Sequence, residues 1–288
     1  MEAIPSIEFF KYESLGNDFV LIESSEDSMD FPSLAKMMCK RRFGIGSDGL
    51  LILNRSTIPY SLRMFNPDGT EDFCGNGLRC TALHLSFSGE ASNIVLFHGG
   101  AEIPVSIGMG GWIDVTLPRP SFEPRRVPLA EGIPEIFDSP LVIEGNRFTA
   151  TAVNTGTTHT ILAVESPPDD ETFRKVSAAL EHHPYFPERT SVIWLWEVSY
   201  NVLKIRIWER GVGETLGCGT GSAAAAAYMF RKKPGLLSVG VENPGGDCAV
   251  AKGPNGSLVV SAKARKVFQG RFFISETGMH GEEMKNVV

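Results

Sequence analysis

The sequence has few cysteines, and their spacing is not typical of disulfides or zinc. Five are spread over 288 residues: Cys39, Cys74, Cys80, Cys218 and Cys248. An odd and widely spaced set argues against the disulfide framework of a small secreted protein, so we expect reduced thiols. Pairs spaced as C-x2-C are missing as well, which argues against a structural zinc site.

Positive charge and long apolar runs are also scarce. The formal net charge is -7 and the pI is about 5.5, so we expect no nucleic acid partner. A membrane span needs roughly 18–20 consecutive apolar residues, and the best run, "SAAAAAYMF", is too short. The first residues, "MEAIPSIEFFKYESLGND", have glutamates where a secretory signal has a basic region. We therefore expect a cytoplasmic location and no membrane partner.

The rest of the composition is that of a globular protein with mixed secondary structure. At 31.4 kDa the chain is long enough for two domains. Short apolar runs rich in β-branched and aromatic residues alternate with Gly, Pro and Asn, which is typical of strands. Four longer stretches predict helices, over residues 31–42, 75–87, 171–183 and 219–233. The fold class that this predicts is α+β, dominated by sheets.

One unusual motif occurs twice, half a chain apart. The first copy is "FNPDGTEDFCGNGLRC" (65–80) and the second is "IWERGVGETLGCGTGSAAAAA" (207–227). In each, a strand, a polar pair and a Gly-rich acidic turn precede Cys-Gly-x-Gly and a helix. Upstream, "LGNDFVLI" and "TGTTHTIL" stand at nearly the same offset from the cysteine. A shared order at nearly constant offsets predicts two similar halves.

A proline-rich connector marks the predicted boundary between these halves. The stretch "LPRPSFEPRRVPLAEGIPE" (117–135) interrupts any strand or helix. We expect an N-terminal lobe of residues 1–120, completed by a final strand at about 266–288, and a C-terminal lobe of residues 121–265. The predicted architecture is two pseudo-symmetric α/β lobes, each a sheet wrapped on a central helix, with the active site in the cleft between them.

The repeated cysteine predicts acid/base chemistry. A helix N-terminus lowers the pKa of a thiol below its usual value near 8.5, so we expect part of each thiol to be ionised at neutral pH. The glycines let backbone amides approach a carboxylate at each helix start. Two thiols on opposite sides of one carbon can remove a proton from one face and return a proton to the other. The product would be the mirror stereocentre.

With these motifs, the sequence resembles the diaminopimelate epimerase family. Members of this family are cofactor-independent amino-acid epimerases. The resemblance covers nearly the whole chain, in order: "LGNDFV" (15–20), "RRFGIGSDGLL" (41–51), "FNPDGTEDFCGNGLRC" (65–80), "TGTTH" (155–159), "FPERTSV" (186–192), "ERGVGETLGCGTGSAAAA" (209–226) and "NPGGD" (243–247). It implies two lobes that close over the substrate, conversion of LL-diaminopimelate to meso-diaminopimelate for lysine and peptidoglycan, and a homodimer. It implies no cofactor, neither pyridoxal phosphate nor a metal.

The resemblance also assigns roles to individual residues. It makes Cys74 and Cys218 the acid/base pair. It places the carboxylate beside the reacting carbon on the two helix starts, at Gly75, Asn76, Gly219 and Thr220. It gives the remaining roles to residues that hold the substrate or tune the thiols: Asn17, Asn66, Glu209 and Arg210 for the substrate, and His159 with Glu209 for the thiols.

Three positions depart from the family pattern. Thr157 and Ser191 stand where asparagines that grip the distal end of the substrate are usual, and "KYESLGND" lacks the usual Met-His-Gly. Hydroxyls are shorter than amides and do not offer the same donor and acceptor pair. We therefore hypothesise that proton transfer is intact while side-chain selection is looser, admitting other acidic amino acids.

Other interpretations stay open at this point. One alternative is a different racemase of the same two-thiol type, acting on glutamate, aspartate or proline. Glu209 and Arg210 argue against it, because they suit a substrate with a second ammonium and a second carboxylate. A thiol-disulfide oxidoreductase would want C-x-x-C, and a cysteine hydrolase with His159 as base leaves the second cysteine unexplained. A non-catalytic binding module is a further alternative. The G-x-G-x-x-G at 44–49 precedes an apolar run instead of opening a helix, which argues against a dinucleotide site.

Overall fold

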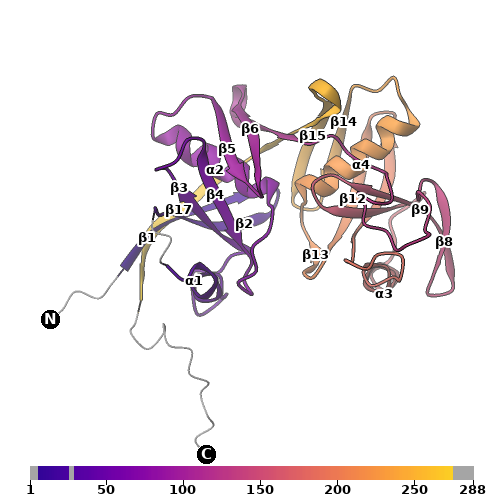
Figure 1. Ribbon diagram of the computed structural model, residues 1–288, viewed down its shortest axis with the longest axis horizontal. Coiled ribbons are helices and arrows are strands. Elements are labelled where there is room, and N and C mark those ends of the chain that lie inside the picture. Colours follow the sequence, from indigo (N-terminus) through magenta and orange to yellow (C-terminus); the bar gives the residue numbers. More distant parts are fainter. Residues whose placement is uncertain (1–5, 26–28, 275–288) are drawn as a thin grey trace, which may run out of the picture.

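The computed structural model describes residues 6–25 and 29–274, which form two lobes side by side (Figure 1). One helix lies inside each lobe, α2 (Gly75–Phe87) in the first and α4 (Gly219–Lys232) in the second. The other two helices are α1 (Phe31–Met38) and α3 (Asp170–Glu181). All four overlap the predicted helices, although α1 ends at Met38 and not at residue 42, and the α+β class is confirmed.

Apart from the last strand, all strands of the first lobe precede those of the second lobe in the sequence. The first lobe contains β1 (Ser6–Ser14), β2 (Asn17–Glu23), β3 (Gly49–Asn54), β4 (Tyr60–Phe65), β5 (Asn93–His98), β6 (Ala101–Ile107) and β7 (Trp112–Leu117). The second contains β8 (Ser139–Ile143), β9 (Asn146–Asn154), β10 (Thr158–Ala163), β11 (Ser191–Ser199), β12 (Val202–Glu209), β13 (Gly213–Thr215), β14 (Ser238–Asn243), β15 (Gly246–Lys252) and β16 (Leu258–Lys263). The chain then returns to the first lobe as β17 (Arg265–Phe273), and short 3-10 turns, η1 (Met109–Gly111) and η2 (Pro254–Gly256), precede β7 and β16.

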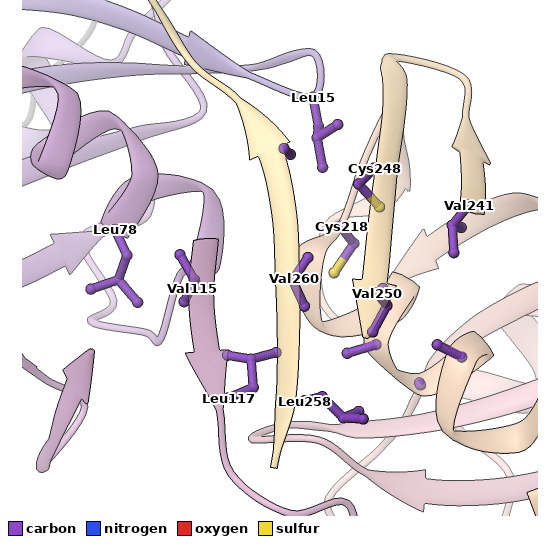
Figure 2. Packing of buried hydrophobic residues seen from close by; sticks show 14 of the residues in the cluster. Leu15, Leu78, Val115, Leu117, Cys218, Val241, Cys248, Val250, Leu258 and Val260 are labelled. Atoms are coloured by element: carbon purple, nitrogen blue, oxygen red, sulfur yellow. The ribbon is translucent and has the colours of Figure 1, made fainter. Parts of the chain in front are cut away.

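The order of strands is the same in both lobes. The first lobe pairs as β17-β1-β2-β3-β4-β5-β6-β7 and the second as β8-β9-β10-β11-β12-β14-β15-β16. Parallel pairs occur at matching places, β2–β3 and β4–β5 against β10–β11 and β12–β14. The two ladders join where β7 pairs antiparallel with β16, with Val115 opposite Val260 (Figure 2). The lobes are therefore pseudo-symmetric, as predicted.

Alternating side chains explain why each sheet has a helix on both faces. Successive residues of a strand point to opposite faces, and β3 is apolar on both. Leu51 and Leu53 belong to the central core with α2, whereas Leu50 and Ile52 pack in a separate core under α1. Strand β11 repeats this division between the central core and the core under α3. Five consecutive alanines, residues 223–227, are buried in α4, and their small size lets strands approach closely.

The proline-rich connector has no regular element between the end of β7 and the start of β8 apart from a bridge between Ser121 and Asn154. We propose that the lobe boundary lies in this segment, near residue 120. The final strand, expected at about 266–288, is observed as Arg265–Phe273 and pairs with β1. Residues 275–288 of that expected segment lie outside the described residues.

Candidate active site

The two cysteines occupy matching backbone positions. Cys74 is the N-cap of α2, with φ -141° and ψ 106°, and Cys218 is the N-cap of α4, with φ -135° and ψ 115°. Each Sγ accepts a hydrogen bond from a glycine amide three residues on, Gly77 and Gly221, at 3.3 Å in both cases. The N-cap needs an extended backbone and a side-chain acceptor, and here sulfur supplies the acceptor.

The two helix starts lie against each other. Asn76, the second residue of α2, donates from Nδ2 to the carbonyl of Gly217 at 3.2 Å and to Oδ1 of Asn17 at 2.6 Å. A Cβ atom built on Gly219 would lie 2.9 Å from Nη2 of Arg79. Because Gly217 and Gly219 flank Cys218, these contacts bring both cysteine corners to one place where the lobes meet.

A buried guanidinium lies beneath this meeting point, and sequence reasoning missed it. Arg79 is 0% exposed, donates from Nε to Ser14 Oγ at 3.2 Å, and donates from Nη2 to Asn76 Oδ1. Its Nη1 is buried and has no hydrogen-bond partner among the described residues. Burial lowers the pKa of Arg79, and thiolate charge at Cys74 or Cys218 would raise it. The signal in the sequence was an arginine in the fifth position of a helix that has no other Lys, Arg, Asp or Glu residue.

Both thiols are harder to ionise than the sequence predicts. Burial raises the pKa of Cys74 to about 12, and it raises the pKa of Cys218 well above its usual value. The helix amides of Gly77 and Gly221 lower both pKa values by smaller amounts. The expectation that part of each thiol is ionised at neutral pH was therefore wrong, because desolvation outweighs the helix N-terminus.

The Glu209 carboxyl group acts on both sulfurs. It lies at the end of β12 and accepts a hydrogen bond from Thr215 Oγ1 at 2.6 Å. Burial raises the pKa of Glu209. After burial, its negative charge is the next contribution that raises the pKa of Cys218, and it also raises the pKa of Cys74. One carboxylate therefore lies within electrostatic reach of both thiols.

His159 reaches Cys218 through a hydroxyl group. The Cys218 Sγ lies 3.2 Å from Thr220 Oγ1, which lies 3.4 Å from His159 Nε2. Burial lowers the pKa of His159 to about 4, so the ring is neutral at pH 7. Its Nδ1 lies 2.9 Å from the carbonyl of Thr157, which assigns the proton to Nδ1 and leaves Nε2 as an acceptor. The Thr220 hydroxyl group therefore connects the Cys218 sulfur to the neutral ring of His159.

The remaining predicted residues differ in whether their hydrogen bonds reach a cysteine corner. The Arg210 amide donates to Ser191 Oγ at 3.1 Å, and its Nη1 donates to the carbonyl of Glu188 at 3.0 Å. Thr157 donates from Oγ1 to Thr220 Oγ1 at 3.5 Å. Asn66 instead bonds Thr70 in its own turn at 3.0 Å, so the contacts of the described residues do not join it to either corner.

Two supporting residues had no predicted role. His98 accepts the backbone N–H of Cys74 on Nε2 at 2.9 Å and donates from Nδ1 to the carbonyl of Leu62. Asp48 accepts from the side chain of Asn17 at 3.4 Å and pairs with Arg41 at 2.8 Å. The pattern "RRFGIGSDG" contains both Arg41 and Asp48, so the motif was visible in the sequence although its use was not.

Residues 6–25 and 29–274 contain neither a cluster of metal-binding side chains nor a membrane-spanning helix. No group of three or more His, Cys, Asp or Glu side chains is arranged there to hold a metal ion. In the same part of the chain, no helix has the length and apolar character that crossing a membrane requires.

Comparison with known proteins places the chain in a family. The family model for diaminopimelate epimerase matches residues 9–107 and 151–279. The diaminopimelate epimerase of Pelotomaculum thermopropionicum is 36% identical over 276 residues, covering 92% of this chain and 98% of that relative. The enzyme of the same name from Moorella thermoacetica is 34% identical over 283 residues, with coverage of 92% and 98%.

Solved structures show the same fold at low sequence identity. A PhzF-family phenazine biosynthesis protein from Bacillus anthracis has a TM-score of 0.67 at 18% identity, covering 94% of this chain and 100% of that chain. A hydroxyproline epimerase from Agrobacterium vitis has a TM-score of 0.67 at 11% identity, covering 95% and 94%. These structures show the fold alone. The matched family model and the two relatives show that the chain belongs to the diaminopimelate epimerase family.

Proposed function

We propose that this protein is an isomerase that inverts one α-carbon of LL-diaminopimelate and releases meso-diaminopimelate. The observation that carries the proposal is the pair of cysteine N-caps whose helix starts are joined by the Asn76–Gly217 hydrogen bond. Membership of the family supports the substrate, and the geometry supports the use of two thiols. The substrate would bind between the lobes, with its reacting carbon between Cys74 and Cys218.

The reaction needs one thiolate and one thiol. The thiolate takes the α-hydrogen as a proton, and the electron pair of the C–H bond stays on the substrate as a carbanion. The opposite thiol then donates its proton to the other face of the carbon and becomes the thiolate. Atoms and charge balance, and no cofactor takes part. The enzyme finishes with the roles of Cys74 and Cys218 exchanged.

The high thiol pKa values suit this chemistry. An amino-acid α-hydrogen is a weak acid, so a strong base is needed to remove it, and a thiolate with a raised pKa is a stronger base than an ordinary one. Glu209 and burial both oppose ionisation of the thiols. The ammonium group of a bound substrate beside Glu209 would neutralise that carboxylate and ease the formation of the thiolate.

The carboxylate beside the reacting carbon would lie on the two helix starts. The first amides of a helix have no intrahelical acceptor, so Gly75 and Asn76 of α2 and Gly219 and Thr220 of α4 can donate to it. The buried charge of Arg79 beneath them favours an anion at the same place. When the α-proton is removed, negative charge spreads from the adjoining carbon onto the carboxylate oxygens, and the donors that hold those oxygens stabilise it.

The distal ammonium and carboxylate would bind Glu209 and Arg210, with Asn17 and Asn66 as further contacts. Thr157 and Ser191 are both committed to neighbours in the protein, Thr220 and the Arg210 amide. We propose that they grip the distal end less selectively than asparagines would, which broadens specificity. An assay of LL-diaminopimelate against glutamate, aspartate and proline decides this. If only diaminopimelate is turned over, the proposal of broadened specificity is wrong. If only another amino acid is turned over, the alternative racemase is favoured.

The test of the main proposal compares wild type with Cys74→Ala and Cys218→Ala. Loss of a positioned acid or base typically costs about 10²- to 10⁴-fold in rate, and we expect losses at the upper end because each thiol has no substitute on its side. Chiral separation of the diaminopimelate stereoisomers measures the rates. A single-cysteine variant that keeps more than about a tenth of the wild-type rate would contradict the two-thiol mechanism.

We also propose that the chain is active as a homodimer, as the family resemblance implies. Light scattering of the purified protein during size-exclusion chromatography tests this. A mass equal to the 31.4 kDa of one chain, under conditions where the enzyme is active, would contradict it.

A further inference from the structure

A buried carboxylate outside the two corners holds the turn that carries Glu209 and Arg210. Glu181 is the last residue of α3 and its side chain is only 5% exposed. Its Oε2 accepts from Trp208 Nε1 at 2.7 Å, and its Oε1 accepts from the Gly211 amide at 2.9 Å. Trp208 and Gly211 are the residues directly before and directly after the Glu209–Arg210 pair.

The rest of the segment after α3 holds the same turn. Arg189 donates from Nη1 to Glu181 Oε1 at 3.2 Å, which gives the carboxylate a third donor. The Arg210 backbone and side chain bond Ser191 and the Glu188 carbonyl. Residues 181–191 therefore fix the turn of residues 208–211 at four points. A buried carboxylate is costly unless its oxygens are hydrogen-bonded, and here both oxygens are.

The matching turn of the first lobe shows that the fold itself does not require such a carboxylate. There Asp68 accepts from the amide and the hydroxyl of Thr70, at 2.9 and 2.6 Å, and the Gly69 amide bonds the Asn66 carbonyl at 2.8 Å. All these bonds are local to the turn. In the second lobe the partners of Glu181 are 27 and 30 residues away in sequence.

We infer that Glu181 is a positioning residue of the epimerase. It holds the turn from both sides, through the Trp208 side chain and the Gly211 amide, and thereby sets where the Glu209 carboxylate and the Arg210 guanidinium stand relative to a bound substrate. The inference rests on the proposed function, in which those two residues hold the distal ammonium and carboxylate.

The substitution Glu181→Gln tests this with little change in volume. An amide has only one acceptor oxygen, which Gly211 and Arg189 would occupy, so the new NH2 group would face the Trp208 N–H. Two donors then oppose each other inside the protein. We expect KM for LL-diaminopimelate to rise about tenfold, with a smaller fall in kcat, because a displaced turn weakens binding of the distal groups. The matched control is Glu171→Gln, an exposed charge change on the same helix, which should behave as wild type.

A second variant separates positioning from general loss of structure. Trp208→Phe removes the opposing N–H and keeps a ring beside Phe173, whose centroid lies 6.1 Å from that of Trp208. We expect KM of the double variant Glu181→Gln/Trp208→Phe to be lower than that of Glu181→Gln alone. A general loss of structure predicts instead a KM no lower than that of Glu181→Gln, because the second substitution also removes part of a packed ring.

The outcomes are distinct. An active wild type with an unchanged KM in Glu181→Gln, or a double variant worse than Glu181→Gln, overturns this inference and leaves the proposed function intact. A wild type that epimerises no diaminopimelate overturns the proposed function itself.

Discussion

The two cysteine corners have the same backbone conformation, but different side chains surround the two sulfur atoms. Cys74 is half-buried, and His98 holds its backbone N–H. Cys218 is 7% exposed, and its Sγ contacts Thr220, which leads to His159. The first corner thus has a histidine on its main chain and the second has one in line with its thiol.

This difference shows which part of the duplicated motif the function needs twice. The cap geometry, the glycine amides and the helix behind them are the same in both corners, and these are the parts that would face a symmetric event at one carbon. The side chains around them have diverged. We conclude that the thiols are equivalent in position and unequal in environment, so they should respond differently to reagents and to mutation.

The largest expected effect is on the rate at which the Cys74 and Cys218 thiols are alkylated. Only the thiolate reacts with iodoacetamide, and Cys74, with a pKa raised to about 12, stays mainly protonated below that pH. Its rate of alkylation should therefore increase about a hundredfold from pH 7 to pH 9. Cys218 should react more slowly at each pH because it is more buried. Mass spectrometry of the cysteine peptides measures both rates, with buried Cys39 and Cys80 as internal controls. A plateau near pH 7 would contradict the raised pKa of Cys74.

Removing the Thr220 hydroxyl should abolish the second corner's distinctive contact. Thr220→Val keeps the shape and the backbone amide, but it separates Cys218 from His159, and we expect kcat to fall about tenfold. Thr220→Ser keeps the hydroxyl and should remain within about twofold of wild type. If the valine and serine variants turn over equally, the hydroxyl has no part in the reaction.

Adding one methyl group to each helix start gives the smallest effect. A Cβ atom on Gly219 would lie 2.9 Å from Arg79 Nη2 and 3.5 Å from Asn76 Oδ1, whereas one on Gly75 meets nothing within 4 Å. Arg79 is itself confined by its bonds to Ser14 and Asn76. Gly219→Ala should lower the free energy of unfolding by about 1–3 kcal/mol, and Gly75→Ala should change it by less than about 0.5 kcal/mol. Denaturant unfolding of both variants measures this, and equal losses would contradict the contact between the corners.

The sequence predicted the elements whose signals are local. The four helices have apolar faces and N-terminal caps, and Asp30 and Asp169 accept from backbone amides as side-chain caps do. The two cysteine corners were visible because the same residues recur in the same order. The strand signals in the sequence did not mark β1, β6, β8, β13 and β15. Proline obscured two of these, Pro104 in β6 and Pro140 in β8, where β8 is an edge strand that tolerates it.

What the sequence could not predict depends on contacts between distant residues. The helix N-terminus was correctly expected to favour thiolates, but the larger opposing effect is burial, which arises only when both lobes cover the corners. Arg79 and Glu181 were missed for the same reason. Their partners, Ser14 and Gly211, lie 65 and 30 residues away, and no local pattern marks either pairing.

The most direct test of the central claim is epimerisation of LL-diaminopimelate in deuterated water, followed to low conversion. If one thiolate removes the hydrogen and the opposite thiol, already exchanged with solvent, returns deuterium, the meso product should carry deuterium at the inverted carbon while the recovered LL substrate carries none. Recovered substrate that gains deuterium as fast as the product would mean that a single group both removes and returns the proton, and the two-cysteine account would be wrong.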